Sequence, residues 1–168
     1  MKDLDSRIDT PALTIERVPG GSYRLSTSLV LDRDLGEVFE FFSDPHNLFR
    51  ITPRWLSLTV RTPQRIEMAE GTKIFYRFRV RGIPAIWHSE ITAWEPPHRF
   101  VDTQRLGPFT KWVHEHLFEE VQGGTLAVDN VTYSVPGGRL IHGLFVEKDL
   151  RRLFTHRHRR LRELLEKA

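Results

Sequence analysis

Hydrophobic and polar residues alternate in several separate segments between residues 23 and 135, which is the pattern of β-strands that bury one face. The clearest case is residues 23–31, where Tyr, Leu, Thr, Leu and Leu occupy every second position. Further strands are predicted between turn residues, at 56–61, 72–79, 85–94, 100–105, 110–120 and 125–135. The alternation therefore predicts about seven strands, and their close spacing favours antiparallel hairpins.

Two short helices are predicted directly after the first strand. Asp32 or Asp34 can cap the first helix, and Ser43-Asp44-Pro45 ends it and opens a second helix over residues 46–51. The apolar face of the first helix consists of Val38, Phe39, Phe41 and Phe42.

A long helix is predicted near the C-terminal end. From Leu140 onward, hydrophobic residues recur with a helical period over about 27 residues, or roughly 40 Å. The element order predicts an α+β domain, in which a curved antiparallel sheet surrounds this helix and the helices lie on one face. Because one helix is too narrow to fill the concave face of such a sheet, a cavity is expected between them.

One domain is expected over residues 21–168, preceded by an N-terminal arm or irregular edge segment at 1–20. The charged residues at 1–5 and the lack of any apolar run of ~18 residues predict neither a secretory signal nor a transmembrane segment, and thus a cytoplasmic protein. The chain has no cysteine, which excludes disulfides, thiolate catalysis and thiolate-bound metals. Common nucleotide-binding, zinc-protease and serine-hydrolase motifs are missing too.

Positive charge is concentrated at the end of the chain. The net charge is +3, but residues 148–168 hold eight Lys or Arg and three acidic residues, which leaves 17 basic and 19 acidic residues elsewhere. Leucine and phenylalanine interrupt the basic run at helical spacing, so most of the arginines are expected on the solvated face of a packed helix. Nucleic acid is therefore not an expected partner. Two alternatives stay open, namely peripheral contact with an anionic membrane and a regulatory interaction module.

The segment with the most candidate chemistry lies in the strand at 110–120. Period two places Trp112, His114, His116 and Phe118 on one face, and the two flanking aromatic rings favour this face as the concave one. Two imidazoles could contribute to a metal site, but the sequence identifies no third ligand. The prediction is therefore two cavity histidines that are hydrogen-bonded to their neighbours, with no metal and no cofactor.

Two residues of the next strand are expected on the same face. If the Gly123-Gly124 pair forms the hairpin loop, Tyr133 lies opposite His114, and Asp129 lies near Phe118 and His116. An Asp–His pair without a nucleophilic Ser, Thr or Cys is more typical of a buried polar network than of catalysis. No catalytic residue is assigned. On earlier strands, Tyr76 and Trp87 share the inward parity.

The order of short motifs resembles the bacterial ligand-binding branch of the SRPBCC superfamily, which includes START-like and polyketide-cyclase-like proteins. The segments that carry the resemblance are Glu37–Leu48 with Ile51-Thr52-Pro53, Trp94–Asp102, Gly107-Pro108-Phe109, Trp112-x-His114-x-His116-x-Phe118, Gly124-Thr125 and Asp129-x-Val131-x-Tyr133-x-x-Pro136. The resemblance implies a helix-grip fold with an internal cavity for lipids, hormones, polyketides or quinones. It also implies that a minority of relatives are enzymes.

The resulting functional hypothesis is the binding or carriage of a hydrophobic small molecule between the sheet and the C-terminal helix. The expected ligand contacts are Tyr76, Trp87, Trp112, His114, His116, Phe118, Tyr133 and Phe145. Leu144 is the other candidate, beside Phe145, for the part of the helix that covers the ligand. The alternative is a cyclase/aromatase- or hydratase-type enzyme that uses His114 or His116 as a general acid–base.

Overall fold

The computed structural model describes residues 13–62 and 66–166 of the chain. Its strands form one antiparallel sheet in the order β1-β2-β8-β7-β6-β5-β4-β3. The strands are β1 (Thr14–Arg17), β2 (Tyr23–Leu31), β3 (Thr59–Val60), β4 (Lys73–Val80), β5 (Ile83–Glu95), β6 (Arg99–Leu106), β7 (Lys111–Val121) and β8 (Gly124–Ser134). The helical elements are η2 (Pro19–Gly21), α1 (Leu35–Ser43), η3 (Pro45–Ile51), η4 (Arg54–Leu56), α2 (Gly138–Ile141), the π-helical turn η5 (His142–Val146) and α3 (Glu147–Leu165).

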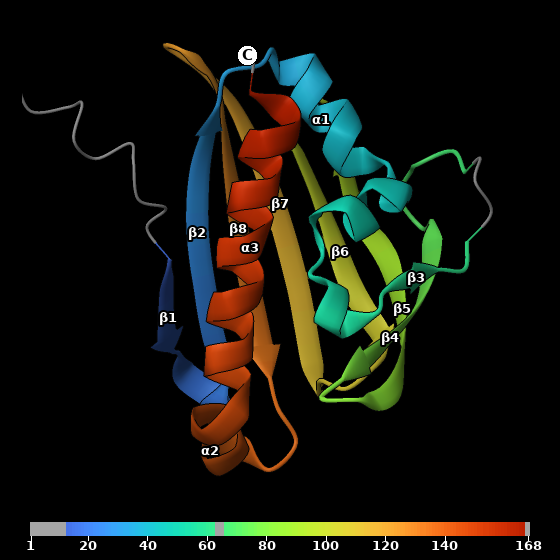
Figure 1. Ribbon diagram of the computed structural model, residues 1–168, viewed down its shortest axis with the longest axis vertical. Helices are drawn as coiled ribbons and strands as arrows, with labels where there is room; N and C mark the ends of the chain where they lie inside the picture. Colours follow the sequence, from blue (N-terminus) through green and yellow to red (C-terminus); the bar gives the residue numbers. More distant parts are fainter. Residues whose placement is uncertain (1–12, 63–65, 167–168) are drawn as a thin grey trace, which may run out of the picture.

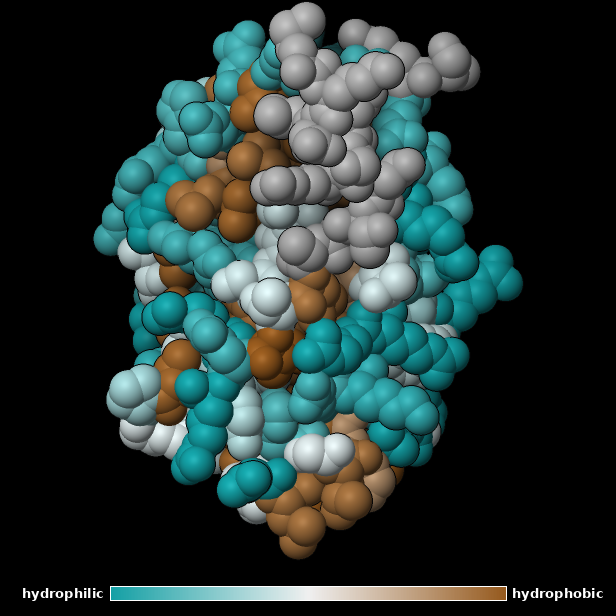
Figure 2. Space-filling model, turned by 90° about the vertical axis from the view of Figure 1, so that its left-hand side faces the viewer, coloured by the Kyte–Doolittle hydropathy of each residue, from teal (hydrophilic) through white to brown (hydrophobic). Residues whose placement is uncertain are grey.

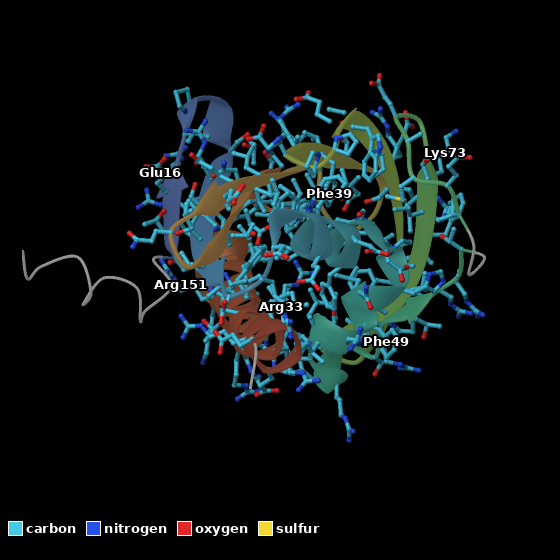
Figure 3. All side chains as sticks on the ribbon, turned by 90° about the horizontal axis from the view of Figure 1, so that it is seen from above. Glu16, Arg33, Phe39, Phe49, Lys73 and Arg151 are labelled. Carbon is cyan, nitrogen blue, oxygen red and sulfur yellow. The ribbon has the colours of Figure 1, made fainter. Side chains whose placement is uncertain are left out.

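The sheet is strongly curved, and the helices lie on its concave side. Seen from above, the strands form three sides of an enclosure, and α3 and the helical turns close the fourth (Figure 3). The long helix α3 runs alongside β2 and β8, and α1 lies across one end of the sheet, where it contacts β7 and β8 (Figure 1). The helical turn η3 lies between α3 and β3 and contacts both. The predicted α+β class, with an antiparallel sheet and a C-terminal helix, is confirmed.

The sheet has eight strands, so the expectation of about seven is wrong. The additional strand, β1, lies within the segment expected to be an arm or irregular edge, and pairs regularly with β2. Its pattern is weak because three of its four residues are exposed at the sheet edge. The remainder of that prediction, residues 1–12, lies outside the described residues.

The β7–β8 hairpin corrects the predicted register. Its loop is Gln122-Gly123, because Gly124 already pairs with Val121. A Cβ at Gly124 would come within 2.0 Å of the carbonyl oxygen of Leu31, so the glycine is required by the close approach of β2. As a consequence, each pairing moves by two positions.

The C-terminal helix differs from a single regular period. The π-helical turn η5 interrupts it and directs His142 into the interior, where the side chain is 4% exposed. The apolar side chains of this end that were expected to face inward, including Leu144 and Phe145, are instead at least one-third exposed. Figure 2 shows the resulting hydrophobic surface at the end of the molecule where α2 lies.

The core is formed by two clusters of buried side chains, and α3 contributes to both. Leu161 and Leu165 pack with Phe39 of α1 and the neighbouring strands, whereas Leu150 and Phe154 pack against β2 and β8. The side chain of Phe39 reaches from α1 toward the sheet (Figure 3). Among the helices of the described residues, none has the length and apolar character needed to cross a bilayer.

Candidate functional site

A cavity of about 590 Å³ lies between the concave face of the sheet and the helices. Its volume falls within the range of small-molecule pockets, roughly 300–1,000 Å³. Most of its wall is apolar and comes from η3, η4, β4, β5 and α3. Representative wall residues are Leu48, Ile51, Trp55, Ile74, Trp87 and Leu153.

Four ionisable side chains form a compact polar cluster on one wall of the cavity. His114 and His116 come from β7, Asp102 comes from β6 and Asp129 comes from β8. Asp102 lies opposite His114, and Asp129 lies opposite His116, in the two ladders that flank β7. Period-two geometry therefore brings residues far apart in the sequence to one patch of the sheet.

The two carboxylates each contact both imidazoles. His114 Nε2 donates to Asp129 Oδ1 at 2.9 Å, and His116 Nε2 donates to Asp102 Oδ2 at 3.4 Å. His116 Nδ1 is also 2.8 Å from Asp129 Oδ1, although its orientation does not give a regular hydrogen bond. His114 Nδ1 and Asp102 Oδ2 are 3.6 Å apart.

These contacts shift the pKa values of the two histidines in opposite directions. Burial by itself lowers the pKa of His116, but the contacts with Asp102 and Asp129 outweigh burial and raise the pKa to about 9. Burial, followed by the charge of His116, lowers the pKa of His114 despite the same carboxylates. At neutral pH the cavity thus presents one imidazolium and one neutral imidazole.

The carboxylates stay ionised in this environment. Burial opposes their ionisation, but the imidazole contacts outweigh it and lower the pKa of Asp102 and bring that of Asp129 well below its usual value. Ser89 Oγ donates to the second oxygen of Asp102 at 2.9 Å, and Trp87 Nε1 donates to Ser89 Oγ at 3.0 Å. This chain fixes the orientation of Asp102 and connects the polar cluster to an aromatic wall.

The cluster also resembles the donor set of a metal site. Asp102, His114 and His116 each offer one ligand atom, and these atoms lie within 4.8 Å of one another. The third ligand that the sequence did not identify is thus supplied by Asp102 on the neighbouring strand β6. Zinc accepts such nitrogen and oxygen donors. In this structure, however, His116 Nε2 pairs with Asp102 and His114 Nε2 pairs with Asp129.

Five of the eight predicted contact residues line the cavity. They are Tyr76, Trp87, Trp112, His114 and His116. The rings of Trp87 and Trp112 meet edge to face with centroids 5.1 Å apart, and form a continuous aromatic surface beside the polar cluster.

The other three lie elsewhere, which corrects their predicted placement. Phe118 shares the inward parity but packs into the core against Phe39 and Phe100. Tyr133 lies opposite Trp112, not His114, and its hydroxyl is 2.9 Å from His142 Nε2. Phe145 lies at the surface, where the Arg81 guanidinium is 4.7 Å from its ring centroid.

Two candidate functional residues were not predicted from the sequence. Asp102 lies within one of the quoted motifs, but its alignment with His114 depends on the β6–β7 register. Arg157 belongs to the basic run, most of whose arginines were expected on the solvated face, and it lines the cavity. Its spacing did contain a signal, because it lies three residues after Phe154 and four before Leu161, which are both buried.

Solved structures similar to this chain share its fold at low sequence identity. Protein Ms6760 from Mycobacterium smegmatis is 17% identical, with a TM-score of 0.65, over 90% of this chain and 96% of that protein. Protein CV1439 from Chromobacterium violaceum is 15% identical, with a TM-score of 0.68, over 86% and 99% of the two chains. A protein from Arthrobacter aurescens is 18% identical, with a TM-score of 0.68, over 89% and 91%.

The comparison by sequence gives a family but no activity. No curated protein matches this chain. Residues 60–165, which contain the polar cluster and Arg157, match the family described as "Domain of unknown function (DUF8410)". The chain therefore belongs to the DUF8410 family.

Proposed function

We propose that the protein binds and carries a hydrophobic small molecule in the cavity between the sheet and α3. The observation that carries this proposal is a cavity of about 590 Å³ whose wall is largely apolar and whose polar groups converge on one patch. Apolar surface supplies affinity in such a pocket, and a few fixed polar groups orient the ligand. Lipids, quinones, polyketides and other aromatic molecules fit this description.

The proposal extends to the fold family. The element order, the long helix on the concave face and the motif positions support a helix-grip domain of the SRPBCC type. The segment Trp94–Asp102 supplies the carboxylate that contacts His116, and Trp112–Phe118 supplies both histidines. Asp129 begins a third of these motifs, so motifs that carry the resemblance supply all four residues of the polar cluster. Fold similarity alone does not transfer an activity, so the ligand must be found by experiment.

Native mass spectrometry of the protein as purified is the first test. We expect a co-purifying apolar molecule that is released under denaturing conditions. Once a ligand is identified, Trp87→Leu should weaken its binding by about tenfold or more, because the indole forms part of the wall. Phe145→Ala is the matched control and should bind as tightly as the parent, since Phe145 lies outside the cavity. Equal affinities for all three proteins would contradict the proposed site.

A second candidate function is supported by the paired histidines. A neutral His114 can accept a proton through Nδ1 if its Nε2 donates to Asp129, and the His116 imidazolium can donate one. Such a pair suits the cyclisation or dehydration of a β-hydroxycarbonyl substrate. Under this hypothesis, His114→Gln abolishes turnover of a polyketide-like panel while ligand binding persists. If the parent protein turns over no substrate of that panel, the enzyme hypothesis fails and only the binding function remains.

A further inference from the structure

Arg157 places a positive charge on the wall of the cavity, on the side contributed by α3. The residue lines the cavity and is partly buried, with its guanidinium carbon 5.0 Å from the centroid of the Phe154 ring. Its Nε atom is buried and has no hydrogen-bond partner among the described residues. The described part of the chain also places no carboxylate within ion-pair distance of it.

Other arginines of the same helix have acidic partners. Arg151 pairs with Glu147 at 2.9 Å, and Arg160 pairs with Glu163. Arg159 is exposed and lies 3.7 Å from Glu163. Arg152 instead lies over the Trp55 ring, with its guanidinium carbon 5.2 Å from the ring centroid. Among the arginines described in α3, Arg157 thus combines a place on the cavity wall with the lack of an acidic partner.

A buried guanidinium is costly unless an anion compensates it. Burial lowers the pKa of Arg157, and Asp129 and Asp102 partly oppose this effect from a distance. Both carboxylates are already engaged with His114 and His116. Their attraction therefore helps to keep Arg157 charged, but its hydrogen-bond donors stay available.

We propose that Arg157 binds the carboxylate of an amphipathic organic acid whose apolar body fills the cavity. This inference rests on the proposed binding function and adds the chemical class of the ligand. The planar guanidinium fork matches a carboxylate with two parallel hydrogen bonds. A phosphate ester fits less well, because it carries more negative charge than a carboxylate. The described residues of the cavity wall include one free cation, Arg157, and four carboxylates, which are Asp44, Asp102, Asp129 and Asp149.

The test compares two ligands that differ only in the head group. Decanoic acid or 1-decanol is added at pH 7.5 to the parent protein loaded with the neutral fluorescent probe N-phenyl-1-naphthylamine. The loss of probe fluorescence gives the affinity for each ligand. We expect the acid to bind about tenfold more tightly than the alcohol, as a charge-assisted hydrogen bond predicts. Arg157→Gln should remove this preference and leave the affinity for the alcohol within about threefold of the parent.

Two further variants separate charge from position. Arg159→Gln removes a positive charge from the same helix at an exposed site and should retain the full preference. Arg157→Lys keeps the charge but not the fork, and should retain part of the preference. The thermal unfolding midpoint of each variant is measured first, to verify that the variant is folded. The comparison of acid and alcohol in the parent protein does not depend on any variant.

The outcomes separate the inference from the function on which it rests. Equal binding of acid and alcohol by the parent, or a preference that survives Arg157→Gln, overturns the role of Arg157 and leaves the proposed binding function intact. If neither decanoic acid, 1-decanol nor the neutral probe binds, the proposed function fails, and the inference about its ligand fails with it.

Discussion

His114 and His116 project from one strand into one cavity, yet their surroundings give them different charges. Both are buried, which disfavours the imidazolium, but His116 contacts two carboxylates closely enough to overcome burial. His114 lies next to that positive charge, with ring centroids 3.8 Å apart, and its own pKa is lowered. The difference arises from contacts across three strands and not from the sequence next to either histidine.

The raised pKa of His116 predicts a loss of stability at alkaline pH. Between its ordinary value of 6.5 and about 9, folded His116 keeps a proton that the unfolded chain has released. The folded state then binds more protons, so the free energy of unfolding falls as pH rises, by up to roughly 1.4 kcal/mol per pH unit. The stabilisation is complete below pH 6.5 and lost above about pH 9.

Urea unfolding at pH 6.5, 7.5 and 8.5 measures this slope. His116→Gln removes the titrating group, so its free energy of unfolding should change less with pH over this interval. His88→Gln is the control, because His88 lies outside the polar cluster and contacts Phe75. The decisive quantity is the difference between the parent and His116→Gln, because other histidines of the folded protein have lowered pKa values and oppose the slope near pH 6.5. Equal pH dependence in the two proteins would show that folding does not raise the pKa of His116.

At the scale of the elements, the C-terminal helix is held to the sheet through the π-helical turn η5. His142 of this turn lies 2.9 Å from the Tyr133 hydroxyl and stacks on Tyr23 with centroids 3.5 Å apart. Tyr133 and Tyr23 are directly opposite each other on β8 and β2. One imidazole therefore connects both strands to the helix near its start.

Tyr133→Phe tests this connection. The substitution removes the hydroxyl partner of His142 inside the core, so we expect the free energy of unfolding to fall by about 1–3 kcal/mol. Ligand affinity should stay close to that of the parent, because Tyr133 does not line the cavity. Chemical denaturation and ligand titration of the same variant give both values.

Tyr23→Phe is the matched control for this prediction. It keeps the ring that stacks on His142, and the Tyr23 hydroxyl has no hydrogen bond among the described residues. We therefore expect a smaller loss of stability than for Tyr133→Phe. If Tyr133→Phe instead lowers ligand affinity strongly without a loss of stability, the Tyr133 hydroxyl contacts the ligand, as the sequence predicted.

Local patterns predicted the elements better than the contacts between them. The alternation at 23–31 matches β2, and the inward face of Trp112, His114 and His116 follows from period two alone. The expected position of Tyr133 was wrong because the hairpin loop is Gln122-Gly123, and Gly124 already pairs with Val121 in the ladder. Phe145 was misplaced because a π-helical turn cannot be recognised from hydrophobic spacing.

At the scale of the whole molecule, the C-terminal helix is basic in composition, but much of its charge is compensated. Ion pairs with Glu147, Glu163 and Glu166 neutralise arginines along α3. Arg152 lies over the Trp55 ring at 5.2 Å, and Arg157 faces the cavity. The basic run is therefore distributed over several directions and several partners, and does not form one free cationic surface.

This distribution predicts weak binding to polyanions. Vesicles with 30% phosphatidylserine and a 20-base-pair DNA duplex should bind weakly at 20 mM salt and not measurably at 150 mM, because exposed charges are screened within about 8–10 Å. Replacing Arg159 and Arg160 together by Gln should reduce the low-salt binding further, whereas Arg157→Gln should not, since its guanidinium points into the cavity. Vesicle co-sedimentation and fluorescence anisotropy measure the two interactions. Binding to vesicles that persists at 150 mM salt would show that the helix acts as a membrane-contact surface. If Leu144→Ala, which removes an exposed hydrophobic side chain, then reduces this binding, the contact lies at the end of the molecule formed by α2 and η5.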